Sequence, residues 1–289
     1  MAPVIVAVTR QSPNNVILYP TNNRIQNITT THLRQLLTHG SMTTDSILNT
    51  FLEVLSAPYN LKYLNSFFYH ILKRDKHWNN LRHWFANSEQ GTLSEPSLNS
   101  TTILIPCHVQ GAHWVALTRR IIENRVIFLY ADDLNQADVE KAVRNSIKAY
   151  ADPSFCPPEA TWITCKSITY RPPSNECGPR TLLALAVMGL HPDPSENMLL
   201  PFMTNNIAQI TRTWIAESLL SGTVPFPTFP YGTQANYSDS SIPGYLYPWD
   251  PHCKINITSR EKTNQVEQKK IAKQPIANAS VIPHMHHTN

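Results

Sequence analysis

Three apolar segments that follow one another with only short breaks limit the fold of this chain more than any other feature. Residue types typical of strands, β-branched and aromatic, are frequent in TTILIPCHV (101–109), HWVALTRRII (113–122) and RVIFLYADDL (125–134). Glu123 and Asn124 leave room only for a tight turn between the second and third segments. The sequence therefore predicts adjacent antiparallel strands in the middle of the chain.

Helical patterns lie on both sides of these strands. Helices are expected within 33–58, 65–86, 135–151, 178–188 and 203–222, and a fourth strand within 161–170. Thr44 or Asp45 could cap the helix SILNTFLEVLS, and Pro58 would end it. Gly189 and Pro192 would end the helix that follows residue 177. This order of elements predicts an α+β fold, with helices packed on a mixed sheet.

The composition divides the chain into three parts. Residues 1–30 are expected to form N-terminal strands and turns, and 31–224 to form the main domain. From about residue 225 prolines and tyrosines accumulate without periodicity, and from Lys254 on the chain is polar. Segments of this kind bury too little apolar surface to offset the entropy of ordering, so 225–289 is predicted to be a mostly disordered tail.

Charge and cysteine content exclude several classes of protein. The chain has 24 Lys and Arg against 20 Asp and Glu, a net charge of +4 that is too small to indicate nucleic-acid binding. Its five cysteines form no CxxC pair, which argues against a disulfide framework and for a reducing, intracellular compartment, the nucleus or cytoplasm. The start lacks a basic signal-peptide region, and no stretch reaches the roughly 18 apolar residues that a membrane helix needs.

Cys177 stands where a polar loop meets an almost wholly apolar segment, SNECGPRTLLALAVMGL. The start of a helix offers unpaired backbone N–H groups and the positive end of the helix dipole, and both stabilise a thiolate. Gly178 leaves room beside the sulfur, and Pro179 suits the first helical turn. A small apolar residue that simply begins a helix would give the same local pattern.

A thiol nucleophile needs a base, and the base needs a partner that orients it. His113 opens one of the expected strands and Asp132 ends the next, so antiparallel pairing could bring them side by side. Asp133 is the neighbour that could take the place of Asp132. Each residue alone also has an ordinary structural explanation, and only their joint occurrence with Cys177 indicates nucleophilic catalysis.

Five segments, taken in order, resemble the ubiquitin-like-protein-specific cysteine peptidases of the SUMO-protease type, whose clan includes the adenovirus protease. These segments are SMTTDSILNTFLEVL, NSFFYHIL, ILIPCHVQGAHWVAL, IFLYADDL and SNECGPRTLLAL. The resemblance covers roughly residues 30 to 220. It implies a papain-like architecture with His113 as base, Asp132 as orienting residue and Cys177 as nucleophile, in that order along the chain.

Two positions depart from the pattern of this family. Arg171 stands where the family usually carries a glutamine that donates to the oxyanion, a role that an arginine could also fill. Met42 stands where a tryptophan usually closes the cleft for the substrate tail, while Trp114, the other wall of that cleft, is kept. These departures bring the recognition of SUMO into question more than the chemistry.

The resemblance implies hydrolysis of a peptide or isopeptide bond that follows a glycine, without a cofactor. The expected partner is a ubiquitin-like protein or a viral or mobile-element polyprotein, with no specific nucleic acid or membrane partner, and the chain is expected to be a monomer. Two alternatives remain open: an inactive relative that binds a ubiquitin-like protein, and a related acyltransferase. A zinc site at Cys107 and His108 is not expected, because no other cysteine has the spacing of a ligand set.

Overall fold

The computed structural model describes the backbone of residues 16–21, 24–38, 40–79, 81, 102–166, 175–202 and 207–224. The strands of its central sheet are β3 (Lys62–Tyr63), β4 (Thr102–Val109), β5 (His113–Ile122), β6 (Arg125–Ala131) and β7 (Thr161–Thr164). The helices are α2 (Thr30–Leu37), α3 (Asp45–Tyr59), α4 (Phe68–Asp75), α7 (Ala137–Tyr150), α8 (Cys177–Leu190) and α9 (Ile207–Ser221), with a short 3-10 helix η1 (Leu200–Phe202). A separate antiparallel hairpin joins β1 (Val16–Thr21) to β2 (Arg24–Thr29).

The central sheet has the strand order β3-β4-β5-β6-β7 and mixes both kinds of pairing. The inner pairs β4–β5 and β5–β6 are antiparallel, whereas the outer pairs β3–β4 and β6–β7 are parallel. Glu123 and Asn124 connect β5 to β6 with positive φ angles of 49° and 61°, the conformation that a two-residue hairpin turn requires. The antiparallel strands expected in the middle of the chain are thus confirmed.

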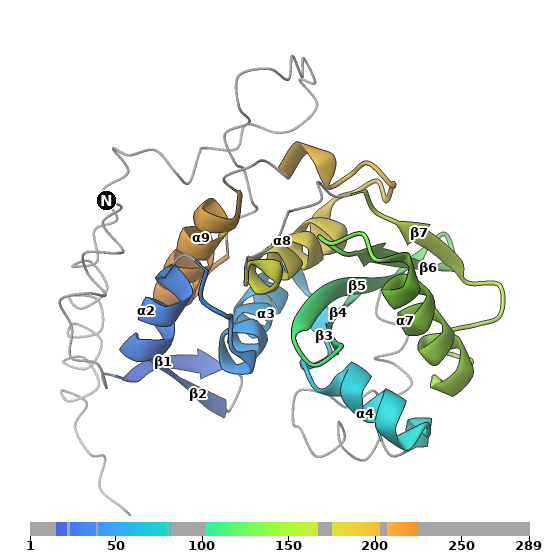
Figure 1. The fold of residues 1–289 in the computed structure, drawn as a ribbon, viewed down its shortest axis with the longest axis horizontal. Helices are drawn as coiled ribbons and strands as arrows, with labels where there is room; N and C mark the ends of the chain where they lie inside the picture. The colour runs from blue at the N-terminus through green and yellow to red at the C-terminus, as the bar shows by residue number, and fades with distance from the viewer. Residues whose placement is uncertain are drawn as a thin grey trace, which may run out of the picture. The chain divides into compact units, whose positions relative to one another are not determined.

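Helices cover both faces of this sheet (Figure 1), and the alternation of side chains along each strand explains how. One set of strand residues packs with α2, α3, α8 and α9, namely Leu104, Trp114, Ala116, Leu129 and Ala131. The intervening residues pack with α4 and α7, namely Ile103, Ile105, Cys107, Val115, Leu117, Phe128 and Tyr130. The sheet is therefore the middle layer of an α+β fold, as the sequence predicts.

Two expected helix ends are wrong. Pro58 lies inside α3, which continues to Tyr59 and ends at Asn60 in the left-handed conformation with φ 51°. Gly189 lies inside α8 rather than at its end, and a Cβ there would come within 2.8 Å of a methyl group of Leu104. This glycine allows the helix to approach the sheet closely, which a pattern along one segment cannot indicate.

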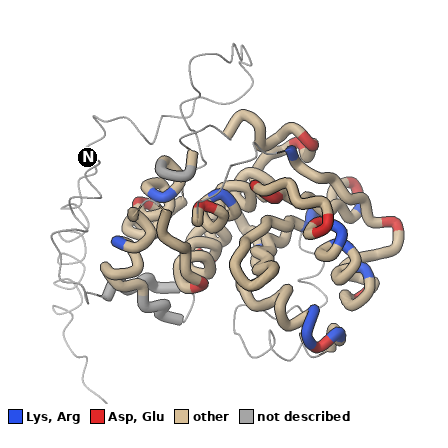
Figure 2. Tube along the Cα trace, in the orientation of Figure 1, with Lys and Arg blue, Asp and Glu red and all other residues tan. Residues whose placement is uncertain are grey.

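Other expectations are met only in part, or fall on residues that the structure does not describe. The fourth strand is shorter than expected and ends at Thr164, and residues 167–174, 203–206 and 225–289 lie outside the described part. Thr44 rather than Asp45 is the N-cap of α3. No helix in the described ranges is long and apolar enough to cross a membrane. Basic and acidic residues are interspersed along the described chain (Figure 2), in keeping with its small net charge.

Candidate active site

Cys177 is the first residue of α8 and differs from the other described cysteines in its exposure. It is partly exposed, whereas Cys107, Cys156 and Cys165 are buried. Burial raises the pKa of all three buried thiols, that of Cys165 to about 12. A thiol reacts as its thiolate, so these three cysteines are poor nucleophiles, and Cys177 is the described cysteine that meets the requirements of a reactive thiol.

The first turn of α8 is shaped by close packing around Cys177. Glu176 is the N-cap residue, but its side chain makes no capping hydrogen bond. A Cβ at Gly178 would lie only 2.5 Å from the Cβ of Thr43, so a larger residue beside the cysteine would displace the segment before α3. Pro179 has no N–H, so the free backbone donors next to the sulfur come from residues at the very start of the helix.

His113 and Asp132 meet at one end of the sheet, where β5 begins and β6 has just ended. His113 Nε2 lies 2.8 Å from Asp132 Oδ1, and both side chains are buried. The same carboxylate accepts hydrogen bonds from the backbone N–H groups of Leu134 at 2.8 Å and Gln136 at 3.0 Å. Burial acts to raise the pKa of Asp132, but these hydrogen bonds outweigh it and hold the pKa below its usual value.

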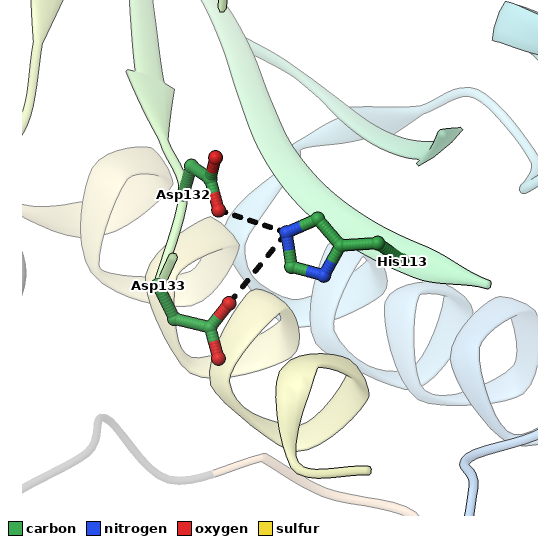
Figure 3. A group of neighbouring side chains, drawn as sticks. All are labelled: His113, Asp132 and Asp133. Carbon is green, nitrogen blue, oxygen red and sulfur yellow. Dashed lines mark hydrogen bonds and ion pairs between the residues drawn. The ribbon is translucent and has the colours of Figure 1, made fainter. Parts of the chain in front are cut away.

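Asp133 approaches the same ring nitrogen without bonding to it. Figure 3 shows both carboxylates directed at one nitrogen of the His113 ring, and the Asp133 Oδ1 atom stands farther off, at 3.7 Å. This oxygen is buried and accepts no hydrogen bond. Burial raises the pKa of Asp133, in contrast to that of Asp132. The geometry therefore favours Asp132 over Asp133 as the residue that orients His113.

The Cys177 side chain lies close enough to the ring of His113 to raise its pKa. Since Nε2 is occupied by Asp132, the other ring nitrogen, Nδ1, is the one available for the thiol. Burial alone would lower the pKa of His113, but the hydrogen bond to Asp132, the neighbouring Cys177 side chain and the two nearby carboxylates raise it to about 10. His113 is therefore protonated at neutral pH and can give a proton to a leaving group.

The remaining residues singled out by sequence lie in different surroundings. Trp114 is buried, and its ring lies 4.4 Å from the ring of His108 between centroids. Met42 is 51% exposed and directly precedes Thr43, the residue that packs against the first turn of α8. Arg171 lies outside the described residues, so its role as an oxyanion donor stays a prediction.

His113, Asp132 and Asp133 are also a group whose ligand atoms could surround a cation, since these atoms lie within 4.8 Å of one another. Asp132 Oδ1 already binds Nε2 of His113, and the Cys177 side chain lies close to the same ring. The arrangement is thus accounted for by a carboxylate, an imidazole and a thiol that lie side by side.

Sequence reasoning did not identify Glu176 and Arg212 as part of this region. Arg212 Nε donates to Glu176 Oε2 at 2.7 Å, directly beside Cys177. The only signal in the sequence is a single arginine within the otherwise uncharged first half of the helix IAQITRTWIAESLLS. A charge at such a position predicts a buried partner, but does not identify it.

Comparison with known proteins shows similarity in structure and none that is detectable in sequence. No protein family and no curated protein matches the sequence. Among solved structures, the C-terminal Ulp1 protease domain in complex with Smt3, the yeast ortholog of SUMO, superposes with a TM-score of 0.57 at 16% identity, over 75% of this chain and 92% of that one. The SUMO protease Ulp1 with its catalytic cysteine oxidised to a sulfinic acid gives 0.56 at 18% identity, over 77% and 94%. This chain therefore has the fold of the Ulp1 protease domain.

Proposed function

We propose that this chain is a cysteine peptidase that hydrolyses a peptide or isopeptide bond after a glycine. One observation carries the proposal. His113 is hydrogen bonded to Asp132 at 2.8 Å, and its ring lies close to Cys177, a partly exposed thiol at the start of a helix. Carboxylate, imidazole and thiol in this chain of contacts are the parts that nucleophilic acyl transfer needs.

The reaction would begin with the thiolate of Cys177 and the protonated ring of His113. The sulfur attacks the carbonyl carbon of the scissile bond, and the oxygen takes up the negative charge of a tetrahedral intermediate. Backbone N–H groups at the start of α8 would stabilise that charge, because the first turn of a helix leaves its N–H groups without internal partners. Arg171, preceding this helix, would add a further donor.

His113 then protonates the leaving amine, the bond between carbon and nitrogen breaks, and a thioester with Cys177 remains. A water molecule gives its proton to His113 and adds to the thioester carbonyl. The bond between carbon and sulfur breaks, which releases the carboxylic acid product and restores the thiolate beside the protonated His113; the acid then gives its proton to the solvent. Asp132 keeps the imidazole oriented and stabilises its charged form through both stages.

A ubiquitin-like protein is the proposed substrate class. The Ulp1 domain that shares this fold is described in complex with Smt3. In this chain Trp114 would form one wall of the cleft for the substrate tail, and Met42 would take the place of the flat aromatic residue on the other side. An exposed methionine offers an adaptable apolar contact, so the proposal covers SUMO, other ubiquitin-like proteins and a viral or mobile-element polyprotein.

Activity-based probes test this proposal directly. A panel of ubiquitin-like proteins ending in a vinyl sulfone or propargyl group is incubated with the wild type and with Cys177→Ala. We expect one member to label the wild type at Cys177, and Cys177→Ala to remain unlabelled while keeping its circular dichroism spectrum. Labelling that persists in Cys177→Ala would overturn the assignment of the nucleophile.

The alternative function is a binding module without catalysis, which the exposed Met42 would also allow. In that case a panel member would bind in a calorimetric titration and fail to label. Cleavage of a fluorogenic substrate that ends in Gly-Gly separates the two functions further, since a binding module would bind such a substrate and release no fluorophore.

A further inference from the structure

A buried ion pair connects the residue before Cys177 to α9. Arg212 Nε donates to Glu176 Oε2 at 2.7 Å, and both side chains are 0% exposed. The attraction within a buried pair is largely offset by the cost of removing both charges from water. Stability alone is therefore a weak reason for this pair, and its position beside the candidate nucleophile suggests another one.

Arg212 binds two further segments with the rest of its guanidinium group. Nη1 donates to the carbonyl of Leu36 at 2.6 Å, and Nη2 donates to the carbonyls of Ser41 and, at 3.2 Å, Asn175. The planar group of an arginine holds its donors in a fixed fork, so these acceptors are held in a fixed relative position. One side chain on α9 thus joins the end of α2 and the residues after it to the residues before α8.

Glu176 strengthens the same connection from the other side. Its second oxygen, Oε1, accepts a hydrogen bond from the N–H of Gly40 at 2.9 Å. The neighbouring Asn175 donates from Nδ2 to the carbonyl of Gly40 at 2.8 Å. Gly40 has a φ of 74°, a conformation that favours glycine and turns its N–H and carbonyl toward this pair of residues. The two segments are therefore bound to each other through both peptide groups of the turn.

Glu176 occupies the N-cap position of α8, but its side chain does not make the hydrogen bond that an N-cap residue usually makes. Glu176 is the N-cap of α8, with φ −95° and ψ −2°, and its carboxylate caps none of the N–H groups of the helix. Those donors stay free for another acceptor beside the sulfur. The carboxylate is instead neutralised by Arg212, and an unpaired carboxylate at this place would repel a thiolate.

We propose that Arg212 and Glu176 are positioning residues for Cys177. Their ion pair fixes residues 175–176, and through them the thiol, beside His113, and it keeps the segment that carries Met42 beside the first turn of α8. This inference rests on the proposed peptidase function for its role in turnover. The placement of the thiol beside His113 is a separate property that can be measured without a substrate.

Two variants separate positioning from stability. Arg212→Met removes the guanidinium and leaves a buried carboxylate without this partner, so both the melting temperature and the alkylation rate of Cys177 should fall. The double variant Arg212→Met with Glu176→Gln removes both charges, and the glutamine oxygen can still accept from the N–H of Gly40. The double variant should therefore recover most of the lost melting temperature, but it lacks the hydrogen bonds that join the segments.

The matched control is Arg119→Met. Arg119 is also a buried arginine that donates to backbone carbonyls, those of Phe155 at 2.7 Å and Ser154 at 3.1 Å. It lies six residues after His113 on β5, which is roughly 20 Å along an extended strand. Its loss should lower the melting temperature and leave the reactivity of Cys177 within about twofold of the wild type, measured on the folded protein.

The main readout is the rate at which iodoacetamide alkylates Cys177 at pH 7, followed by mass spectrometry well below the melting temperature. All proteins carry Cys253→Ser, and the three buried cysteines are followed as internal references. We expect both the single and the double variant to alkylate Cys177 at least about tenfold more slowly than the Arg119→Met control. We expect kcat on a cleavable substrate to fall by a similar factor, with a smaller change in KM.

The outcomes distinguish this inference from the peptidase proposal. If the double variant regains both its melting temperature and the wild-type alkylation rate, the ion pair is only structural and the inference is overturned. If alkylation slows as expected but the wild type cleaves no substrate, the positioning role stands and the peptidase proposal fails. Equal alkylation rates in all variants would overturn the positioning role and leave the peptidase proposal untouched.

Discussion

The hydrogen bonds of Asp132 make a specific prediction about its replacement by asparagine. Oδ1 accepts from His113 Nε2 and from the N–H of Leu134, and Oδ2 accepts from the N–H of Gln136. In Asp132→Asn one of the two oxygens becomes an NH₂ group, which is a donor. In either orientation of the asparagine amide, its NH₂ group then faces an N–H group that is also a donor. The less costly orientation keeps the oxygen toward His113 and loses the hydrogen bond from Gln136.

The size of the effect follows from these contacts. Hydrogen bonds to a charged group contribute about 1.5–3 kcal/mol, and a tenfold change in rate corresponds to about 1.4 kcal/mol. Loss of the charge that supports the imidazolium should therefore lower kcat/KM by about 10- to 150-fold. The polar group left without a partner should lower the free energy of unfolding by about 1–3 kcal/mol.

Asp133→Asn is the matched control, since Asp133 Oδ1 lies 3.7 Å from His113 Nε2 and accepts no hydrogen bond. This variant loses only the electrostatic attraction between the Asp133 carboxylate and the His113 ring, so kcat/KM should fall less than about tenfold. Burial raises the pKa of Asp133, so its contribution to stability is fully present at low pH and is lost as the pH rises through that value. Asp133→Asn should therefore melt at or above the wild-type temperature at pH 8.

The assay is the pH dependence of kcat/KM on a fluorogenic substrate, together with the titration of His113 by NMR. In the wild type the raised pKa of His113, about 10, places the loss of the imidazolium far above neutral pH. Asp132→Asn should move that loss to lower pH, because the acceptor that stabilises the charged ring is weakened. A larger fall in Asp133→Asn than in Asp132→Asn would make Asp133 the orienting residue, and no fall in either would refute the proposed role of the pair.

Three further predictions concern stability. Gly178→Ala should lower the free energy of unfolding by about 1–3 kcal/mol in urea denaturation, because its Cβ would lie 2.5 Å from the Cβ of Thr43. Thr43→Gly in the same chain should recover most of the loss. A Gly178→Ala protein more stable than the wild type would contradict this packing. Burial raises the pKa of Glu217 to about 7 from its usual value of 4.5, so its stabilising contribution is fully present below the lower value and is lost as the pH rises through the higher one. Glu217→Gln should therefore raise the melting temperature at pH 8 and change it least at about pH 4. Deletion of 225–289 should leave a cooperative thermal transition, with limited proteolysis cutting first within that tail, whereas a tail protected from protease would count against the proposed boundary.

The central sheet could be predicted from the sequence because its signals are local. Strand composition, a turn of Glu123 and Asn124, and alternation within each strand each involve residues close together in the chain. The ends of α3 and α8 could not be predicted in this way. Asn60 ends α3 by adopting the left-handed conformation, and Gly189 continues α8 because it packs on Leu104 from a distant strand.

The same distinction, between signals from residues close in the chain and contacts between distant residues, applies to the candidate site. Cys177 and His113 each carry a local signal, a helix start and a strand start, and antiparallel pairing of neighbouring strands brings Asp132 to His113. The choice between Asp132 and Asp133 needed distances, because adjacent residues share every sequence signal. The contact between Glu176 and Arg212 joins residues 36 positions apart through no regular pairing, so only the folded structure identifies it.

The thiol and the base of the proposed site are held by different layers of the fold. His113 and Asp132 are fixed by the sheet and by the turn after β6, whose N–H groups at Leu134 and Gln136 bind the carboxylate. Cys177 is fixed by the helical layer, through the ion pair that joins Glu176 to α9. The two sets meet where the side chains of His113 and Cys177 lie close together, so the reactivity of the thiol depends on how α8 rests on the sheet. The close approach at Gly189, where a Cβ would come within 2.8 Å of a methyl group of Leu104, is one contact through which α8 rests on the sheet.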